Sequence, residues 1–296
     1  MRNRRFTLAG DEGKLIRLIL LAAGAALLLL IVILAARTEP SVMSSAEIRT
    51  IQDRGLLRVG VRTDMPGMGY DGEGLELELA DLLARRLLPD IPAGNSIRYV
   101  DVNASNVDAK MADGQIDLAL AMMPSGQKSS QYSYSRPYYE DKCYFITAAS
   151  TEKLVLQNVS AGYVQNTPEA DILTQYALGR PNANVSPLKF ASYPDMLSAV
   201  IHGRVDVALM SELYITRYQN ETALNPDSLI PYKLYTFRVS GISPGSVQYA
   251  VACPVDTPAI ATLANIMLED MRESGALLRL YEKHGLKAAA AALDKE

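Results

Sequence analysis

The amino-acid sequence predicts an α/β protein built from two similar lobes. One phrase occurs twice, as GQIDLAL at residues 114–120 and as GRVDVAL at residues 203–209. Each copy follows a helix-like stretch and continues into an apolar run typical of a buried parallel strand. The glycine suits the end of a helix, where a left-handed backbone is needed. Reuse of this unit at wide spacing favours two lobes over a short solenoid repeat, and a length of 296 residues allows about two domains.

The composition argues against several classes of function. Hydrophobic residues make up 49% of the chain and charged residues 21%, so the chain is able to form a packed core. The net charge of −4 offers no basic excess for phosphates, so we expect no nucleic-acid partner. With 2 Cys and 2 His, a zinc cluster of the usual spacing is not expected, and we predict no metal and no cofactor.

An apolar run at residues 18–36 is long enough to cross a bilayer as a helix, which takes about 20 residues. Basic residues precede it, so the positive-inside rule leaves residues 1–17 in the cytoplasm and the chain after Arg37 outside. We therefore expect a signal-anchor, with a linker at residues 37–45 and the remainder in the periplasm or at the outer face of the cell membrane. The alternative is a cleaved signal peptide, although such peptides have apolar cores of roughly 7–15 residues.

After the linker, the sequence predicts a β-α-β-α-β series. A short helix ends at Gly55, a strand and a loop rich in Gly, Pro and Asp follow, and leucines at helical spacing stop before Pro89. A further strand and helix lead into the first repeated phrase. The predicted elements are helix 46–54, strand 56–61, loop 63–74, helix 75–88, strand 97–102 and helix 106–112.

The second half of the chain predicts similar elements. Thr167 and Pro168 make a good helix start, with Thr as the N-cap and Pro in the first helical position. Residues 256–284 contain two amphipathic helices divided at Ser274 and Gly275. The other predicted elements are strand 188–191, helix 194–202, helix 213–219, edge strand 229–239 and a fraying tail at 288–296.

Several motifs resemble, in order, those of the family-3 extracellular solute-binding proteins. These are type II periplasmic binding proteins that deliver polar amino acids to ABC importers. The resemblance covers residues 46–287. The matching stretches are GLLRVGV at 55–61, DMPGMGY at 64–70, GLELELA at 74–80, SRPYY at 135–139 and GALLRLYEKHG at 275–285, together with the two repeated phrases.

The resemblance implies the type II periplasmic-binding-protein fold, in which two crossing strands join two parallel-sheet lobes. Lobe 1 is expected to comprise residues 46–142 and 253–287, and lobe 2 residues 143–252. The crossing strands are expected at residues 143–149 and 247–252.

The two cysteines lie at the ends of these crossing strands. Cys143 opens the first strand and Cys253 closes the second, so antiparallel pairing would bring the two thiols toward each other. A disulfide requires Cα atoms closer than about 7 Å, and an extracytoplasmic location would permit one. Of the two outcomes, we favour two separate buried thiols over a disulfide.

Small molecules bind open α/β sheets at loops beyond the carboxyl ends of the strands, and this rule selects four places. An aromatic side chain at Tyr70 suits the cover of a bound solute, and Ser125 offers a hydroxyl beside backbone groups. Free N–H groups at the predicted helix start attract an anion. The predicted ligand-binding residues are Asp64, Tyr70, Met122, Met123, Ser125, Lys128, Asn166, Thr167, Ser211 and Glu212.

Two positions depart from the amino-acid clamp that the resemblance implies. Family members usually hold the α-carboxylate with an Arg, but the matching residue is Lys128, a point charge without the planar fork. They usually hold the α-amino group with an Asp, but the matching residue is the neutral Ser211. Glu212 follows, and one residue further along a strand it would face the other way. We therefore expect a small polar solute that is an amino acid or a related acid or amide, and not necessarily an ordinary α-amino acid.

The resemblance implies a membrane-anchored solute-binding protein whose lobes close on a solute by hinge motion and deliver it to the permease subunits of an ABC importer. One alternative is a ligand sensor that acts through a partner, since only residues 1–17 precede the predicted span. Another is an enzyme on the same fold, a dehydratase or a lytic transglycosylase, which needs a positioned acid or base. Glu78 and Glu212 are the acidic candidates, and Glu78 is more simply an acid in the first turns of a helix. We predict no catalytic residue.

Overall fold

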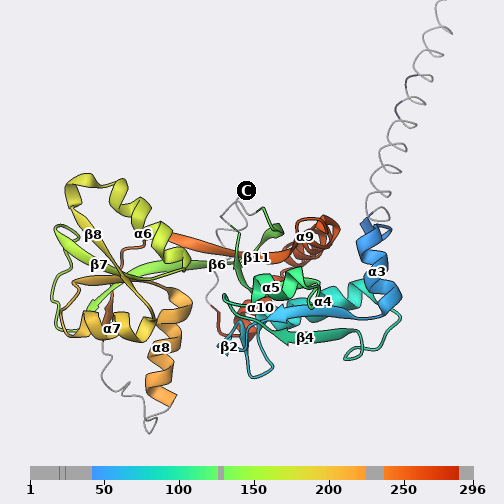
Figure 1. The fold of residues 1–296 in the computed structure, drawn as a ribbon, viewed down its shortest axis with the longest axis horizontal. Helices are drawn as coiled ribbons and strands as arrows, with labels where there is room; N and C mark the ends of the chain where they lie inside the picture. The colour runs from blue at the N-terminus through green and yellow to red at the C-terminus, as the bar shows by residue number, and fades with distance from the viewer. Residues whose placement is uncertain (1–19, 21–23, 25–41, 126–129, 225–236, 287–296) are drawn as a thin grey trace, which may run out of the picture.

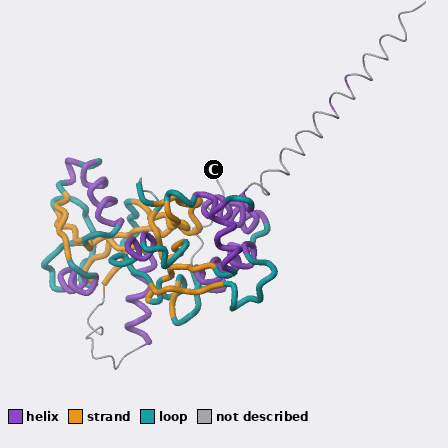
Figure 2. Tube along the Cα trace, turned by 45° about the vertical axis from the view of Figure 1, so that its right-hand side comes forward, coloured by secondary structure: helices purple, strands orange, loops and turns teal. Residues whose placement is uncertain are grey.

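The computed structural model describes residues 20, 24, 42–125, 130–224 and 237–286. Figure 1 shows two α/β lobes joined by long strands, and Figure 2 shows strands running through the middle with helices toward the outside. The predicted cytoplasmic stub, the tail and all of the predicted membrane span except Leu20 and Gly24 lie outside the described residues. Within the described part of the chain, no helix has the length and apolar character needed to cross a membrane.

One nine-stranded mixed sheet runs through both lobes in the order β4-β1-β5-β11-β6-β9-β7-β8, with β10 paired to β6. In one lobe β1 is parallel to β4 and β5, and in the other β7 is parallel to β8 and β9. The antiparallel pair β6 and β11 joins these two parallel parts, so the lobes share a continuous sheet. The strands are β1 Leu57–Val61, β4 Ile97–Asp101, β5 Leu118–Pro124, β6 Tyr132–Ala148, β7 Val159–Val164, β8 Val185–Phe190, β9 Val207–Ser211, β10 Phe237–Val239 and β11 Gly245–Pro254, with the separate hairpin β2 Asp64–Met65 and β3 Gly69–Tyr70.

Helices cover the sheet of each lobe, and the C-terminal helices return to the first lobe, where α9 packs on α3 and on strands β6 and β11. The first lobe contains α3 Ala46–Arg54, α4 Leu75–Leu87, α5 Val107–Ala112, α9 Pro258–Glu273 and α10 Ala276–Lys283. The second contains α6 Pro168–Leu178, the 3-10 helix η1 Pro181–Ala183, α7 Tyr193–Ile201 and α8 Glu212–Leu224. The residue limits that the sequence predicts for the two lobes stay predictions.

The repeated phrase performs the same structural task in each lobe. Its glycine adopts the left-handed backbone expected at a helix end, with φ of 63° in the first copy and 66° in the second. Its aspartate then accepts a hydrogen bond from the backbone of the neighbouring parallel strand. Asp117 accepts from the Arg58 N–H at 2.8 Å, and Asp206 accepts from the Ser160 N–H at 2.8 Å. The phrase therefore recurs because each lobe fixes the strand that follows it, β5 or β9, against the first strand of that lobe in the same way.

The first crossing strand is longer than the sequence predicts, and this changes the position of the cysteines. Because β6 begins at Tyr132, Cys143 lies near its middle and not at its start. Cys143 is opposite Gly245, while Cys253 is opposite Ser133, ten residues away along the same strand. Ten residues of strand span about 30 Å, far beyond the reach of a disulfide. Both thiols are free and buried, which confirms the favoured outcome, whereas the expectation that antiparallel pairing brings them together is wrong.

Candidate functional site

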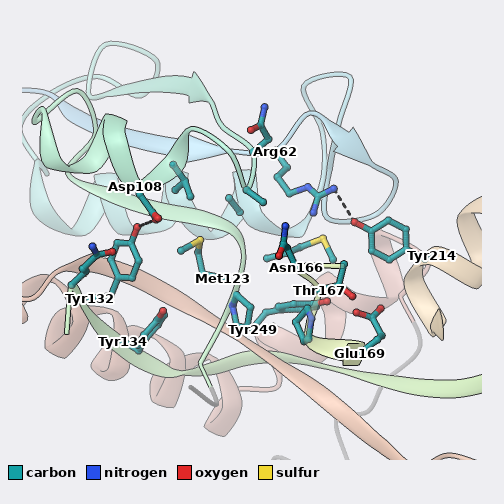
Figure 3. Close-up of a pocket in the computed structure, with 18 of the residues that line it drawn as sticks. Arg62, Asp108, Met123, Tyr132, Tyr134, Asn166, Thr167, Glu169, Tyr214 and Tyr249 are labelled. Atoms are coloured by element: carbon teal, nitrogen blue, oxygen red, sulfur yellow. Dashed lines mark hydrogen bonds between the residues drawn. The ribbon is translucent and has the colours of Figure 1, made fainter. Parts of the chain in front are cut away.

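A cavity of about 600 Å³ lies between the two lobes. Figure 3 shows side chains of both lobes converging on it. The lobe 1 side consists of residues at the ends of β1 and β5, in α5 and at the start of β6, and the lobe 2 side consists of the start of α6 with tyrosines of α7 and α8. The lining residues are Arg62, Asn103, Ala104, Val107, Asp108, Ala121, Met122, Met123, Pro124, Ser130, Gln131, Tyr132, Tyr134, Asn166, Thr167, Pro168, Glu169, Tyr193, Tyr214 and Tyr249.

The structure brings four of the predicted ligand-binding residues together at this cavity: Met122, Met123, Asn166 and Thr167. Lys128 lies outside the described residues.

Five others do not line the cavity, for different reasons. Tyr70 is 54% exposed on β3, and the Ser125 hydroxyl donates to the Gln248 carbonyl at 3.2 Å. Ser211 is completely buried at the end of β9, and Glu212 is the first residue of helix α8, so the strand rule applied to it does not hold. Asp64 lies beside the cavity and is bound to a residue that lines it, as described below.

Met122 has an unusual backbone at the end of β5. Its φ of 52° lies in the left-handed region, which a bulky residue rarely adopts. The pairing of β5 with β11 is irregular here, and the Met122 N–H donates to the buried carboxyl of Glu76 at 2.6 Å. The Tyr138 hydroxyl donates to the same carboxyl oxygen of Glu76. A strained residue held by buried partners beside a cavity is typical of a functional site, because surrounding structure must maintain it.

Asn166 and Thr167 bring the start of α6 to the cavity wall. Asn166 has a left-handed backbone with φ of 59°, which asparagine tolerates better than most residues. Thr167 occupies the predicted N-cap position, but its hydroxyl donates to the Val164 carbonyl at 2.8 Å and does not cap the helix. The side chain therefore secures the turn before the helix, and it leaves capping of the first N–H groups to other partners.

A charged cluster crosses from one lobe to the other at the cavity. The Arg62 guanidinium donates twice to Asp64, at 2.8 and 2.9 Å, and donates to the Tyr214 hydroxyl of the other lobe at 3.1 Å. Arg217 of lobe 2 lies 3.5 Å from the Asp64 carboxylate. Burial alone would lower the pKa of Arg62, but its bonds to Asp64 and Tyr214 outweigh burial and raise it. We name these four residues the interlobe cluster.

Two tyrosine–carboxylate pairs occupy different sides of the cavity. On the lobe 2 side, the Tyr193 hydroxyl donates to Glu169 Oε1 at 2.9 Å, and Glu169 is only 2% exposed. On the lobe 1 side, the Tyr132 hydroxyl donates to the Asp108 carboxylate. Figure 3 shows Glu169 near Tyr214 and across the cavity from Tyr132 and Asp108.

Aromatic rings form much of the remaining wall. Tyr193 stacks on Tyr214 with ring centroids 4.1 Å apart, and Tyr132 meets Tyr134 edge-on at 6.0 Å. Burial and the neighbouring Glu169 carboxylate raise the pKa of Tyr193 well above its usual value, so its hydroxyl stays a donor. The cavity therefore offers ring faces, hydroxyl donors and carboxylate acceptors to a small polar guest.

Arg62, Glu169 and the tyrosines line the cavity but are not among the residues predicted from the sequence. Arg62 directly follows β1, so the strand-end rule applied one residue earlier would have found it. Glu169 follows a threonine and a proline, a pattern that is also typical of an ordinary helix start. The tyrosines of α7 and α8 carry no local signal, because only the tertiary fold brings them to the cavity.

An α/β fold of two lobes with a polar and aromatic cavity between them has the form needed to enclose a small solute. The sequence profile of the bacterial extracellular solute-binding proteins, family 3, matches residues 57–287, so the chain belongs to that family. Members of this family are solute receptors and not enzymes, in agreement with the prediction from sequence. No curated protein sequence matches the chain.

Solved structures show the same fold at low sequence identity. A mutant of ArgBP from T. maritima is 19% identical, with a TM-score of 0.58 over 80% of this chain and 98% of that one. The solute receptor for L-cysteine of Neisseria gonorrhoeae is 20% identical, with a TM-score of 0.58 over 80% and 92% of the two chains. The probable amino-acid ABC transporter extracellular-binding protein ytmK from Bacillus subtilis is 14% identical, with a TM-score of 0.62 over 77% and 97%.

Proposed function

We propose that this chain is a membrane-anchored, extracytoplasmic receptor that captures a small polar solute between its lobes and delivers it to an ABC importer. The observation that carries the proposal is the cavity between the lobes, to which both lobes contribute polar side chains. A solute that contacts both walls at once favours the closed arrangement, because it binds that arrangement better than an open one.

The solute proposed is an amino acid or a related acid or amide. Structures of similar fold carry arginine, L-cysteine or amino-acid transport in their names, which supports this class. The volume of about 600 Å³ is within the range of small-molecule sites. The N–H groups at the start of α6 supply donors for a carboxylate, and Glu169 and Asp108 supply acceptors.

Binding is tested by thermal unfolding of the full chain with a panel of amino acids, their amides and matching acids. A solute at about 100 times its Kd raises the free energy of unfolding by about 2.7 kcal/mol, which is readily detected. Calorimetry then gives the affinity of each hit. A panel without any stabilising member would refute the proposal, and turnover of a hit would assign the protein to a different class.

The anchor is tested separately. The apolar run at residues 18–36 with basic residues before it supports one span with the binding lobes outside. An extracytoplasmic reporter fused after Glu296 should be active and a cytoplasmic reporter inactive. The reverse pattern would place the lobes on the inner side of the membrane, and release of the mature chain into solution would indicate a cleaved signal peptide.

A further inference from the structure

Glu169 is a buried carboxylate that faces the cavity, and it has no cationic partner among the residues that the structure describes. It lies in the first turn of α6, is 2% exposed and lines the cavity wall. Among the described residues, the hydrogen bond to its side chain comes from Tyr193, which donates to Oε1, and no Lys or Arg forms an ion pair with it. Its second oxygen, Oε2, is left for a donor that comes from the cavity.

Arg62, the arginine that lines the cavity, already has hydrogen-bond partners. Arg62 donates from Nε and Nη2 to Asp64 and from Nη2 to Tyr214, so its charge is already paired with the Asp64 carboxylate. The described charged residues that line or border this part of the cavity are therefore two arginines, Arg62 and Arg217, against the three carboxylates of Asp64, Asp108 and Glu169. A buried carboxylate is costly unless a cation pairs with it, and a solute that brings a positive charge removes this cost.

The surroundings of Glu169 also fit a cation. Tyr193 bonds Glu169 and stacks on Tyr214, and Tyr249 also lines the cavity. Ring faces attract ammonium and guanidinium groups. Tyr193 holds Oε1 in place, so the carboxylate is oriented before a ligand arrives. By contrast, Ser211 is neutral, fully buried and not part of the cavity wall.

We propose that Glu169, with the rings of Tyr193, Tyr214 and Tyr249, is the subsite for a cationic nitrogen of the solute, an ammonium or guanidinium group. This inference rests on the proposed function and names the chemistry of one side of the cavity. In this proposal Glu169, on helix α6, binds the amino group that an aspartate at the position of Ser211 usually binds in the family. A solute without a cationic nitrogen leaves Glu169 buried and unpaired, and is selected against.

The test uses the full chain, calorimetry and three forms of the protein. Glu169→Gln keeps the acceptor for Tyr193 and removes the charge. Asp171→Asn is the matched control, because it removes the same charge from the same helix turn at a residue that does not line the cavity. The probes are L-lysine, Nα-acetyl-L-lysine, Nε-acetyl-L-lysine, 1,5-diaminopentane, L-glutamine and N-acetyl-L-glutamine, so each charged group is removed in turn.

We expect the wild type to bind a probe with a free amine more tightly than the same probe acetylated at that nitrogen. Glu169→Gln should weaken the free-amine probe about tenfold to a hundredfold, the range for one charged hydrogen bond, and should abolish its advantage over the acetylated one. Asp171→Asn should keep both the affinity and the advantage.

Other results overturn the inference in distinguishable ways. If Glu169→Gln leaves binding unchanged, or weakens free and acetylated probes equally, the cation subsite is refuted while the proposed function stands. If the wild type binds the acetylated probes more tightly than the free amines, the cation subsite is likewise refuted and the proposed function stands. If the wild type binds none of the six probes, the free and acetylated forms of a solute found by the thermal-unfolding panel replace them; if that panel also yields no ligand, both the subsite and the amino-acid function are refuted.

Discussion

Replacing Asp141 with Asn should stabilise the protein at alkaline pH and leave it unchanged in acid. Asp141 lies on crossing strand β6 and is 1% exposed. Its Oδ1 accepts a hydrogen bond from the Leu213 N–H at the start of α8, at 3.2 Å, while Oδ2 has no hydrogen-bond partner among the described residues. Asparagine keeps the Oδ1 acceptor, so the substitution removes the charge with little change in shape.

The magnitude follows from the pKa of this carboxyl. Burial, reinforced by the nearby Glu169 and Glu212 carboxylates, raises the pKa of Asp141 from its usual 3.8 to about 7. A folded-state pKa above the unfolded one means that the protonated acid favours the folded state. This contribution is complete below pH 4 and is lost as the pH rises through about 7. The interval between the two pKa values corresponds to about 4 kcal/mol, and relaxation of the site makes about 2–4 kcal/mol the expected range.

Urea unfolding followed by circular dichroism between pH 4 and 8.5 gives the free energy of unfolding of both proteins. Asp141→Asn should match the wild type near pH 4 and exceed it by about 2–4 kcal/mol at pH 8.5. Asp206→Asn is a control of opposite sign, because hydrogen bonds from Ser160 lower the pKa of Asp206. It should lose stability at neutral pH, and the loss should shrink in acid. If Asp141→Asn is less stable at pH 8.5, or its effect does not vary with pH, Asp141 is not the buried acid described here.

Three further predictions concern the backbone, the lobe contact and the thiols. Gly74→Ala should destabilise the fold by about 3 kcal/mol or more, because the φ of Gly74, 137°, is forbidden to alanine and a Cβ there would overlap a backbone carbonyl. Gly72→Ala is the control: the space around Gly72 is open, so it should cost less stability in the same urea titration. Tyr214→Phe removes the hydrogen bond that joins Tyr214 to Arg62 of the other lobe, worth about 1 kcal/mol, so the lobes should open more readily without ligand. Small-angle scattering should then show a larger radius of gyration, and an unchanged radius would contradict a role of this bond in holding the lobes closed. Thiol titration of the unfolded, unreduced protein should find two free thiols per chain, and fewer would contradict the strand register.

Elements with a strong local signal could be predicted from the sequence. The two C-terminal helices divide where predicted, with α9 ending at Glu273 and α10 beginning at Ala276, since a glycine in the left-handed region separates two amphipathic patterns. Strand β6 was underestimated because residues 132–142 are polar and aromatic and contain a proline. Such a stretch becomes a strand here because it pairs with β11 along most of its length, which is a tertiary cause.

The residues of the candidate site also fall into two groups: those that a local sequence signal predicts and those that only tertiary packing brings to the cavity. Met122 and Met123 were predicted because a strand end is visible in sequence and parallel strands place such ends at a shared edge. Glu169 was not, because an acid after Thr167 and Pro168 is fully explained by the start of a helix. Glu169 differs from an ordinary helix-start acid because it is buried and bonded to Tyr193. Tyr193 belongs to α7, and only tertiary packing brings the two residues together. When the acidic residue of the site lies at a helix start, as Glu169 does, and not at a strand end, the motifs of the fold are unchanged but the chemistry of the site differs. The solute must therefore be inferred from the assembled cavity.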